Sequence, residues 1–404
     1  MNVLIERFRS CFKCDNVNVI ENEEQSSSLP DEIYFHIFQY LDLTSLKSAR
    51  LVCHHWKWLV RQSRHLTKSR VTLNIINMED VLKSEIVQDV EELKYDRDYL
   101  FDTRVIRTLI YYVRWMSPSK LKCLDLTCSL PVNNGAWIKE LKYAYIDHED
   151  LIELFSLLPV VKISHQKFKD GAEEEIFSHI LNSNNLRLKC LHFHFNCLPR
   201  SKVNPETFSA GASKLSEIKL SFLSRELCQA LFEYIIHSTD IQLVKMGIES
   251  KFLEKLDPKL MARAVCKLKS VSLRNSYLRE QHLIAILMKI SNCEEDVKLE
   301  HLDISHTIKL FRCEVDQDLF SSAAVNLVSL KADCNSGQTV SILDKIYESN
   351  SSKLENLALL TPVPREGYPL EKLAVVESKL KFLALRSCTT LSFVLPDHID
   401  NLTF

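Results

Sequence analysis

The chain has 404 residues, which exceeds one ordinary compact domain and indicates two or more units or one elongated repeat array. Apolar residues make up 46% and charged residues 26%, which is typical of a folded soluble protein. The formal net charge is −2 and no stripe of Lys and Arg stands out. This balance argues against a sequence-independent grip on nucleic acid, so we expect no nucleic-acid partner.

The first residues and the cysteines indicate an intracellular protein. The segment MNVLIERFRSCFKC lacks the apolar run of a signal peptide, because Glu6, Arg7 and Arg9 interrupt it. No apolar run approaches the roughly 18 residues that cross a bilayer, so we expect no membrane partner. The 13 cysteines are odd in number and scattered singly, which is typical of free thiols in a reducing compartment. We expect a cytoplasmic or nuclear protein, and no basic cluster decides between the two.

Glycine is rare, with six in the whole chain, and this composition disfavours Gly-rich nucleotide loops. The sequence also contains no GxGxxG, GxxxxGK[ST], GxSxG or HExxH motif. The usual signatures of an enzyme are therefore missing, and we expect no catalytic site and no cofactor.

Residues 1–27 end in the polar run ENEEQSSS and are expected to form a disordered N-terminal tail. Within it, Cys11 and Cys14 form a lone CxxC. A structural zinc site needs a second pair of ligands, and no second CxxC exists. We therefore expect no metal in the tail.

The stretch LPDEIYFHIFQYLDLTSLKSARLVCHHWKWL, residues 29–59, is rich in large apolar residues. Pro30 followed by Asp31 and Glu32 predicts the first turn of a helix. Apolar residues then recur at helical spacing, and a second apolar run begins near Leu46. A helical unit of about 40 residues is marginally stable alone and cannot bury all of these side chains, so we expect other surfaces to cover part of it.

This stretch resembles the F-box, and we place the F-box at residues 28–68. The signature positions are Leu29, Pro30, Glu32, Ile33, Ile37, Phe38, Leu41, Leu46, Ala49, Arg50, Val52, Cys53, Trp56 and Leu59. The later Leu-Trp pair of the family is half present, with Leu66 followed by Thr67. The resemblance implies docking on a Skp-type adaptor, and through it on a cullin and a RING subunit. We expect adaptor contacts from Leu29, Pro30, Ile33, Ile37, Leu41, Leu46, Val52 and Trp56. The sequence does not separate contact from core among them, except that Leu29 and Pro30 at the helix entrance are expected to be contacts.

A Leu-x-x-Leu-x-Leu unit, with apolar substitutions, recurs ten times. It reads LKCLDL at 121, LPVVKI at 158, LKCLHF at 188, LSEIKL at 215, IQLVKM at 241, LKSVSL at 268, LEHLDI at 299, LVSLKA at 327, LENLAL at 354 and LKFLAL at 380. After a first gap of 37 residues the spacing stays between 26 and 31, with amphipathic segments between the units. A strand plus a helix at this period is typical of leucine-rich repeats.

We therefore predict an α/β fold, in which the small all-helical F-box precedes a curved leucine-rich-repeat solenoid of about ten repeats over 121–404. Its parallel strands would line the inner curve and its helices the outside. Residues 69–120 are expected to hold a linker and degenerate first repeats, with RVTLNI at 70–75 as a candidate strand. The ninth position of each repeat usually carries a small polar side chain. Because Leu223 and Glu249 stand there, we expect the ladder of hydrogen bonds to be broken between them.

The inner face of the predicted solenoid is the candidate target-binding surface, because the variable strand positions point to it. Its mixed charges and aromatics favour a protein or peptide partner over a phosphate backbone. The candidate contact residues are Lys162, His192, His194, Glu217, Lys219, Arg274, His301, Asp303, Lys331, Asp333 and Arg386.

Metal or nucleophile chemistry on this face has weak support from the sequence. The histidines of the repeat at 188 lie four strands from those of the repeat at 299, or roughly 19 Å, so they cannot share an ion. His192 and His194 alone lack two ligands. Cys190 shares a strand face with His192, but the sequence shows no third group that would orient the pair.

The combination of an F-box with leucine-rich repeats is similar to the substrate receptors of Skp–Cullin–F-box ubiquitin ligases. The resemblance implies a non-catalytic subunit that holds a target protein near the ubiquitin-loaded enzyme. The alternative that the sequence leaves open is a non-degradative scaffold bound to the adaptor without a cullin. A free-standing repeat inhibitor and an enzyme are the remaining alternatives.

Overall fold

The structure is a computed structural model, and its chain divides into two compact units, Met1–His65 and Leu66–Phe404. The described residues are 29–38, 41, 45, 48–62, 70–73, 90–95, 108–109, 111–114, 121–126, 145–146, 148–163, 167–168, 171–194, 203–292, 296–307, 315–349, 351–359 and 368–385. The expected tail at 1–27 and the predicted site residues Leu46 and Arg386 lie outside them.

The first unit contains helices α2 (Asp31–Phe38) and α4 (His54–Gln62), which pack on each other. Helix α2 begins after Pro30, whose carbonyl accepts from the Ile33 amide at 2.9 Å, and its first turn is acidic as the sequence predicts. The helical character expected for this part of the chain is confirmed.

The second unit is built on a parallel sheet of 12 strands, in the order β1-β2-β3-β5-β7-β8-β9-β10-β11-β12-β13-β14. Neighbours in the sheet are thus neighbours along the chain, apart from a separate pair formed by β4 (Tyr145–Ile146) and β6 (Lys167–Phe168). The strands are β1 Arg70–Leu73, β2 Glu92–Tyr95, β3 Cys123–Leu126, β5 Val160–Ile163, β7 Cys190–His194, β8 Glu217–Ser221, β9 Lys245–Glu249, β10 Ser270–Ser272, β11 His301–Ile304, β12 Ser329–Ala332, β13 Asn356–Leu359 and β14 Phe382–Leu385.

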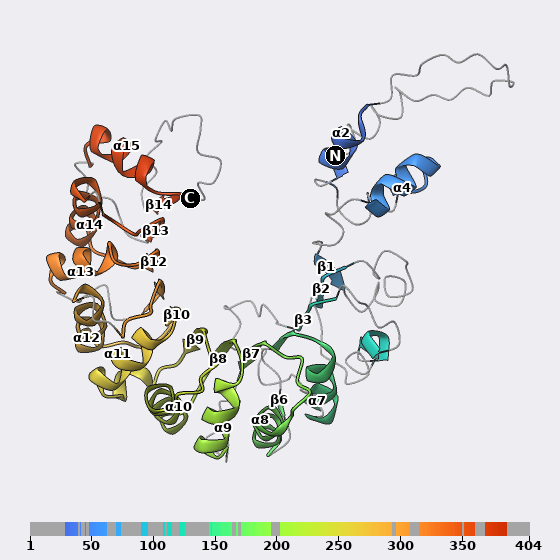
Figure 1. Cartoon of the computed structure of the whole chain (residues 1–404), viewed down its shortest axis with the longest axis horizontal. Helices are drawn as coiled ribbons and strands as arrows, with labels where there is room; N and C mark the ends of the chain where they lie inside the picture. Colours follow the sequence, from blue (N-terminus) through green and yellow to red (C-terminus); the bar gives the residue numbers. More distant parts are fainter. Residues whose placement is uncertain are drawn as a thin grey trace, which may run out of the picture. The chain divides into compact units, whose positions relative to one another are not determined.

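Helices connect successive strands and together cover one face of the sheet, so the other face is free of these helices (Figure 1). They are α7 His148–Leu157, α8 Ala172–Asn182, α9 Pro205–Ser213, α10 Arg225–His237, α11 Pro258–Lys267, α12 Glu280–Ser291, α13 Gln317–Ala324, α14 Ser336–Glu348 and α15 Leu370–Lys379, with the 3-10 helix η3 at Leu253–Lys255. The predicted mixture of parallel strands and helices is therefore confirmed.

The apolar positions of the repeated unit form the core between strands and helices. Strand side chains stack in register, as where Leu191 pairs with Ile218 and Ile218 pairs with Met246. Each of these three residues is at most 2% exposed. A single strand–helix unit cannot bury such side chains, so each unit depends on its neighbours.

The strand register corrects one repeat frame predicted from the sequence. We expected IQLVKM at 241 to supply the apolar positions, with Val244 among them. Instead Met246 and Ile248 are buried and Val244 is 40% exposed, because Met246 is the residue aligned with Ile218 and Val271. The unit therefore begins at Leu243. The frame was misplaced because Ile241, Val244 and Met246 have the same spacing as Leu243, Met246 and Ile248.

The expected break in the hydrogen-bond ladder is also wrong. Ser250 bridges the two repeats, because its hydroxyl donates to the Leu223 carbonyl at 3.0 Å. Its amide donates to the Ser276 hydroxyl at 3.1 Å, which in turn donates to the Ile248 carbonyl at 2.8 Å. Counted from Leu243, the ninth position is Lys251, and the polar link is supplied one residue before it.

Helix length alternates along the array. Helices α8, α10, α12 and α14 have 11, 13, 12 and 13 residues, whereas α9, α11, α13 and α15 have 9, 10, 8 and 10. The close approach of α9 to α8 needs Gly211, since a Cβ there would lie 2.7 Å from the Phe177 carbonyl oxygen.

Each shorter helix caps the C-terminus of the longer helix before it. Lys214 donates to the Leu181 carbonyl and Lys267 to the Ile236 carbonyl. Asn326 donates to the Ile290 carbonyl at 3.3 Å, and Lys379 donates to the Ile346 and Tyr347 carbonyls at 2.9 and 2.7 Å. The last carbonyls of a helix lack intrahelical donors and carry partial negative charge, so these side chains satisfy them. Each such contact thus joins a longer helix and the shorter helix after it into a pair of strand–helix units.

Candidate functional site

Large apolar side chains are exposed on the first unit. Leu29 and Ile33 are 46% and 44% exposed at the start of α2, and Trp58 is 50% exposed on α4. Leu51 and Val52, between the helices, are 87% and 63% exposed. Within the described part of this unit, five large apolar residues are therefore open to a partner, and such a concentration is typical of an interaction surface.

The structure separates the predicted adaptor contacts into two groups. Leu29, Pro30, Ile33 and Val52 are exposed, whereas Ile37 and Leu41 are half-buried. Sequence reasoning did not include Leu51 and Trp58, although both are large apolar residues beside the predicted positions.

Trp56, predicted as a contact, is half-buried and takes part in the internal packing. Its ring meets those of Tyr34 and Phe38 edge-on, with centroids 5.5 and 5.3 Å away. Tyr34 and Phe38 are themselves buried, at 8% and 2% exposed. This aromatic cluster joins α2 to α4, so Trp56 helps to hold the exposed residues of both helices in place.

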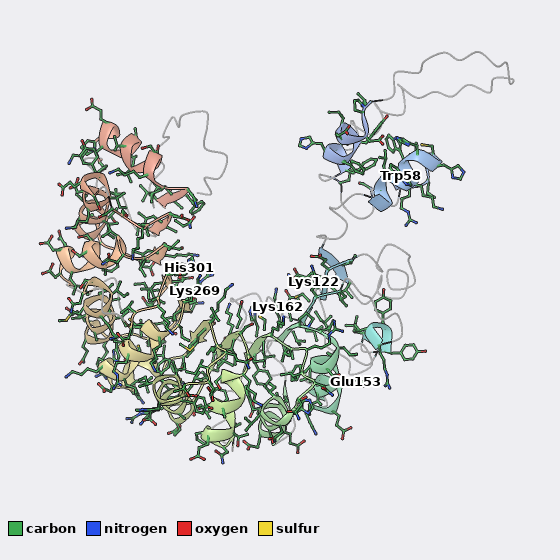
Figure 2. The ribbon with its side chains drawn as sticks, in the orientation of Figure 1. Trp58, Lys122, Glu153, Lys162, Lys269 and His301 are labelled. Carbon is green, nitrogen blue, oxygen red and sulfur yellow. The ribbon has the colours of Figure 1, made fainter. Side chains whose placement is uncertain are left out.

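The second surface is the face of the parallel sheet opposite the helices, which we call the strand side. Figure 2 shows Lys162 and His301 on this face, directed away from the helices. Lys162 lies among acidic side chains, with its Nζ 3.4 Å from Glu92 Oε1 and 3.8 Å from Asp125 Oδ2. Burial alone would lower the pKa of the Lys162 ammonium, but Cys123 and these carboxylates together outweigh burial and raise it. Three adjacent strands, β2, β3 and β5, thus contribute to one charged group.

A second polar group lies on β7 to β9. His192 Nε2 is 3.4 Å from Glu217 Oε1, and Lys245 Nζ is 3.7 Å from Glu217 Oε2. The hydrogen bond from His192, with Lys245, lowers the pKa of Glu217. Cys190 lies beside this pair, and burial raises the pKa of its thiol to about 12. Cys190 and Glu217 are both third in their repeated units, and the strand register pairs them, although the sequence analysis did not connect them.

The remaining predicted residues are spread along the same side of the sheet. Lys219 and Arg274 are exposed, and Lys331 is partly exposed. His301 lies 3.7 Å from Glu300, and Asp303 accepts from the Ser305 hydroxyl at 2.6 Å. His194 is the last residue of β7, opposite Ser221. These residues do not converge on one point, as expected of a surface that contacts a protein rather than a small molecule.

Asp333 was predicted to lie on the accessible face, but it is only 4% exposed. Its Oδ2 accepts from the His306 amide, and its Oδ1 is buried with no partner. Burial raises the pKa of this carboxyl. Asp333 therefore links two repeats at the strand ends and is not available to a partner.

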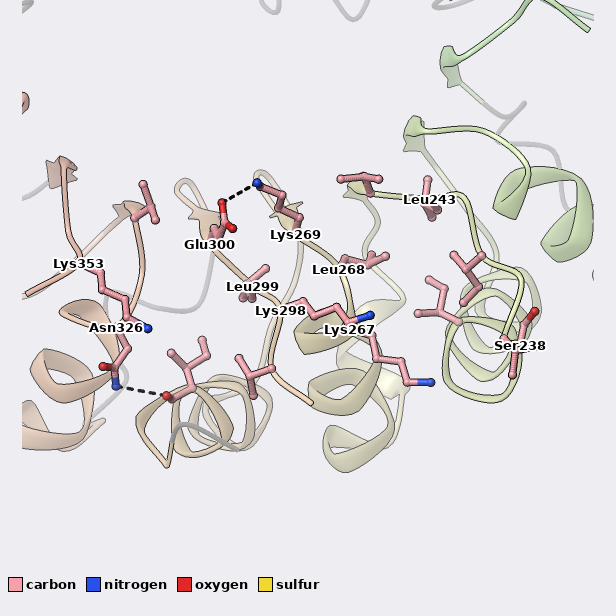
Figure 3. A pocket seen from close by; sticks show the side chains of 17 residues that line it. Ser238, Leu243, Lys267, Leu268, Lys269, Lys298, Leu299, Glu300, Asn326 and Lys353 are labelled. Carbon is pink, nitrogen blue, oxygen red and sulfur yellow. Dashed lines mark hydrogen bonds and ion pairs between the residues drawn. The ribbon is translucent and has the colours of Figure 1, made fainter. Parts of the chain in front are cut away.

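A cavity of about 910 Å³ opens at the edge of the sheet where helices lead into strands (Figure 3). Lys269 pairs with Glu300 at 3.0 Å, and Lys267 and Asn326 cap helix ends as described above. These lining groups already form contacts between neighbouring strand–helix units, so we assign no ligand to the cavity.

Comparison with known families identifies one part of the chain. Residues 26–70 match the family model described as F-box-like, which covers α2, α4 and the exposed apolar residues of the first unit. No curated protein matches the chain. The chain therefore carries an F-box-like domain, a kind of domain that generally binds Skp-type adaptors. Across the described residues, no helix combines the length and the apolar character that crossing a membrane requires.

Proposed function

We propose that the chain is the substrate-recognition subunit of a Skp–Cullin–F-box ubiquitin ligase. In this proposal the F-box-like domain docks on the Skp-type adaptor, which connects it to the cullin and the RING subunit. The second unit is a leucine-rich-repeat solenoid whose strand side binds a target protein. The chain performs no bond chemistry and acts in the cytoplasm or the nucleus.

The observation that carries the proposal is the set of exposed apolar side chains within the F-box-like match. Leu29, Ile33, Leu51, Val52 and Trp58 all lie in residues 26–70. A folded domain gains no stability from them in water, whereas a partner surface would bury them at about 25 cal/mol per Å². Their exposure is therefore explained by an adaptor that covers them.

The solenoid proposal is supported by the strand order and the repeat pattern. Strands of the second unit pair in parallel with their sequence neighbours, and helices connect them on one side. An array of this kind presents a continuous row of variable side chains on its strand side. Mixed charges there, such as Lys219, Arg274 and Asp303, are suited to a protein partner. The role of the chain is then to raise the effective concentration of target lysines near the ubiquitin thioester.

Docking of the F-box-like domain on the adaptor is tested by co-purification, comparing the intact chain with the Leu29→Ala/Pro30→Ala variant. We expect the variant to lose adaptor and cullin together while retaining the target, which then accumulates in cells. Val375→Ala is the matched control, because Val375 is an exposed apolar residue of the second unit at 40%. Unchanged adaptor capture by the variant would contradict the proposal. Adaptor capture without cullin by the intact chain would favour the non-degradative scaffold.

The target arm is tested with Lys219→Glu/Arg274→Glu. Lys219 is exposed on β8 and Arg274 is exposed in the turn after β10, so we expect the variant to lose the target and keep the adaptor. Lys259→Glu is the control, since Lys259 is exposed on helix α11. Equal target loss from both variants would place recognition elsewhere on the array.

A further inference from the structure

Three side chains of different chemistry converge on the strand side of β7 and β8. Ligand atoms of Cys190, His192 and Glu217 all lie within 4.8 Å of one another. Among the residues that the structure describes, this is the one group of three or more His, Cys, Asp or Glu residues with such spacing. The group therefore differs from the ordinary ion pairs along the same face.

The parallel ladder fixes this arrangement. Cys190 and His192 are two residues apart on β7, so they point to the same face. Cys190 pairs in register with Glu217 on β8, which places the carboxylate on the neighbouring strand beside the thiol. The backbone positions of all three ligands are thus set by the sheet rather than by a loop.

We propose that Cys190, His192 and Glu217 bind a zinc ion, with a water molecule at the fourth position. Thiolate, imidazole and carboxylate are the three ligand types that Zn²⁺ takes in proteins. The thiolate and the carboxylate together balance the charge of the ion. Three protein ligands with an open fourth position are typical of accessible zinc sites rather than closed structural ones.

The distances require little rearrangement. Zinc bonds of about 2.0 to 2.3 Å place tetrahedral ligand atoms roughly 3.5 Å apart. His192 Nε2 and Glu217 Oε1 are already 3.4 Å apart. The remaining separations, up to 4.8 Å, close by side-chain movements of about 1 Å. The ion therefore fits without a change in the strands.

The surroundings allow entry and leave the carboxylate available. Cys190 is 8% exposed, whereas the side chains of His192 and Glu217 are 22% and 36% exposed, so the site opens toward the strand side. Lys245 contacts Glu217 Oε2, while His192 faces Glu217 Oε1. One oxygen can bind the ion while the other keeps its contact with lysine, which would hold the carboxylate in place.

The test uses the full-length chain in a Cys11→Ser/Cys14→Ser background, which removes the CxxC of the N-terminal segment. The chain is stripped with a chelator and titrated with Zn²⁺ alone against a chromophoric competitor. We expect one equivalent of zinc per chain. Cys190→Ser and Glu217→Gln should each weaken binding by at least about 10-fold, since changes even to residues supporting metal ligands have effects of that size.

Two further measurements separate a metal site from a structural ion pair. Co²⁺ in place of zinc should give a thiolate-to-cobalt charge-transfer band that Cys190→Ser abolishes. Zinc should raise the thermal midpoint of the parent more than that of Glu217→Gln, because tighter binding to the folded state stabilises it more. Without zinc, the parent and Glu217→Gln should unfold at similar temperatures, which shows that the variant folds.

His301→Asn is the matched control. His301 lies on the same side of the sheet and close to Glu300, at 3.7 Å. The His301→Asn variant should bind zinc with the same affinity as the parent. The proposal is overturned if the parent takes up no zinc, or if both Cys190→Ser and Glu217→Gln retain the parent affinity. Adaptor capture measured on the same samples should not change, so failure here leaves the proposed function standing.

Discussion

The two units place their large apolar residues in opposite ways. In the second unit the repeated strand positions are sealed between sheet and helices, as for Leu191, Ile218 and Leu220, which are fully buried. In the first unit, Leu51 and Val52 are among the most exposed apolar side chains described. The same residue types therefore have different roles: in the array they hold the fold together, and in the F-box-like domain they are available for another protein.

The difference follows from what each unit can use as a neighbour. Each strand–helix unit of the array has another such unit on either side, so its apolar face is covered within the chain. The two described helices of the first unit have a small shared interface, which the aromatic cluster of Tyr34, Phe38 and Trp56 fills. Its surplus apolar surface must be covered by something else or remain in water.

The contrast is tested most severely in the core of the array. Phe208 is fully buried, with its ring centroid 4.8 Å from that of Phe177. We expect Phe208→Ala to lower the free energy of unfolding by about 3 to 5 kcal/mol, through lost burial and the cavity left behind. Urea denaturation followed by circular dichroism measures the change. Met288→Ala, at a half-exposed site on α12, should change it by less than about 0.5 kcal/mol. Equal effects would mean that the array does not depend on this packing.

The capping contacts between paired helices should have the next largest effect. The Lys379 Nζ donates to three carbonyls at the end of α14, at 2.7 to 3.0 Å. Lys379→Met keeps the aliphatic stem and removes the donors, so we expect a loss of about 1 to 2 kcal/mol, confined to the C-terminal repeats. Hydrogen exchange of α14 and α15 measures it. Lys381→Met breaks an exposed pair with Glu355 and should have little effect.

Ile33→Ala tests the exposed apolar residues of the first unit. Ile33 is exposed on α2 and alanine favours a helix, so the stability of the first unit should not fall. Adaptor affinity, measured by calorimetry with purified Skp-type adaptor, should fall about 10-fold, or about 1.4 kcal/mol. A loss of thermal stability without a loss of affinity would place Ile33 in the core instead.

The smallest expected effect concerns the buried carboxyl between two repeats. Because burial raises the pKa of Asp333, the folded state favours its protonated form. Its contribution to stability is therefore full below the unfolded pKa and is lost as pH rises through the folded pKa. Asp333→Asn removes this dependence and should gain about 1 kcal/mol at neutral pH, with no gain at acid pH. Thermal unfolding of the parent and the variant, measured from acid to neutral pH, gives the gain at each pH. An equal gain at every pH would contradict a raised pKa of Asp333.

Much of the fold could be predicted from the sequence, because its signals are local and periodic. Repeated apolar spacing shows where strands such as β8 and β11 lie, and Pro30 with the acidic residues after it marks the start of α2. The strand β2 was missed, although its segment VEELKY has the apolar spacing of the repeated unit and its Val90 and Leu93 are fully buried. The frame at β9 was misplaced because two sets of apolar residues, Ile241/Val244/Met246 and Leu243/Met246/Ile248, fit the repeated spacing equally well.

The site was less predictable because its residues meet across strands. Periodicity places Cys190 and His192 on one face and aligns Cys190 with Glu217, but only the structure shows how close the three side chains come. In the first unit, helical spacing marks Ile33 and Trp56 alike as apolar. Only the packing of α2 on α4 shows that Ile33 is exposed while Trp56 meets the rings of Tyr34 and Phe38.

The alternation of long and short helices sets the module by which the array can be rebuilt. Because Lys214, Lys267, Asn326 and Lys379 each reach back to the longer helix before them, the smallest portable segment is a doublet. Excising one doublet would rejoin matching ends, whereas excising a single strand and helix would set two helices of the same kind side by side. An engineered chain should therefore tolerate shortening in steps of two repeats and resist shortening by one.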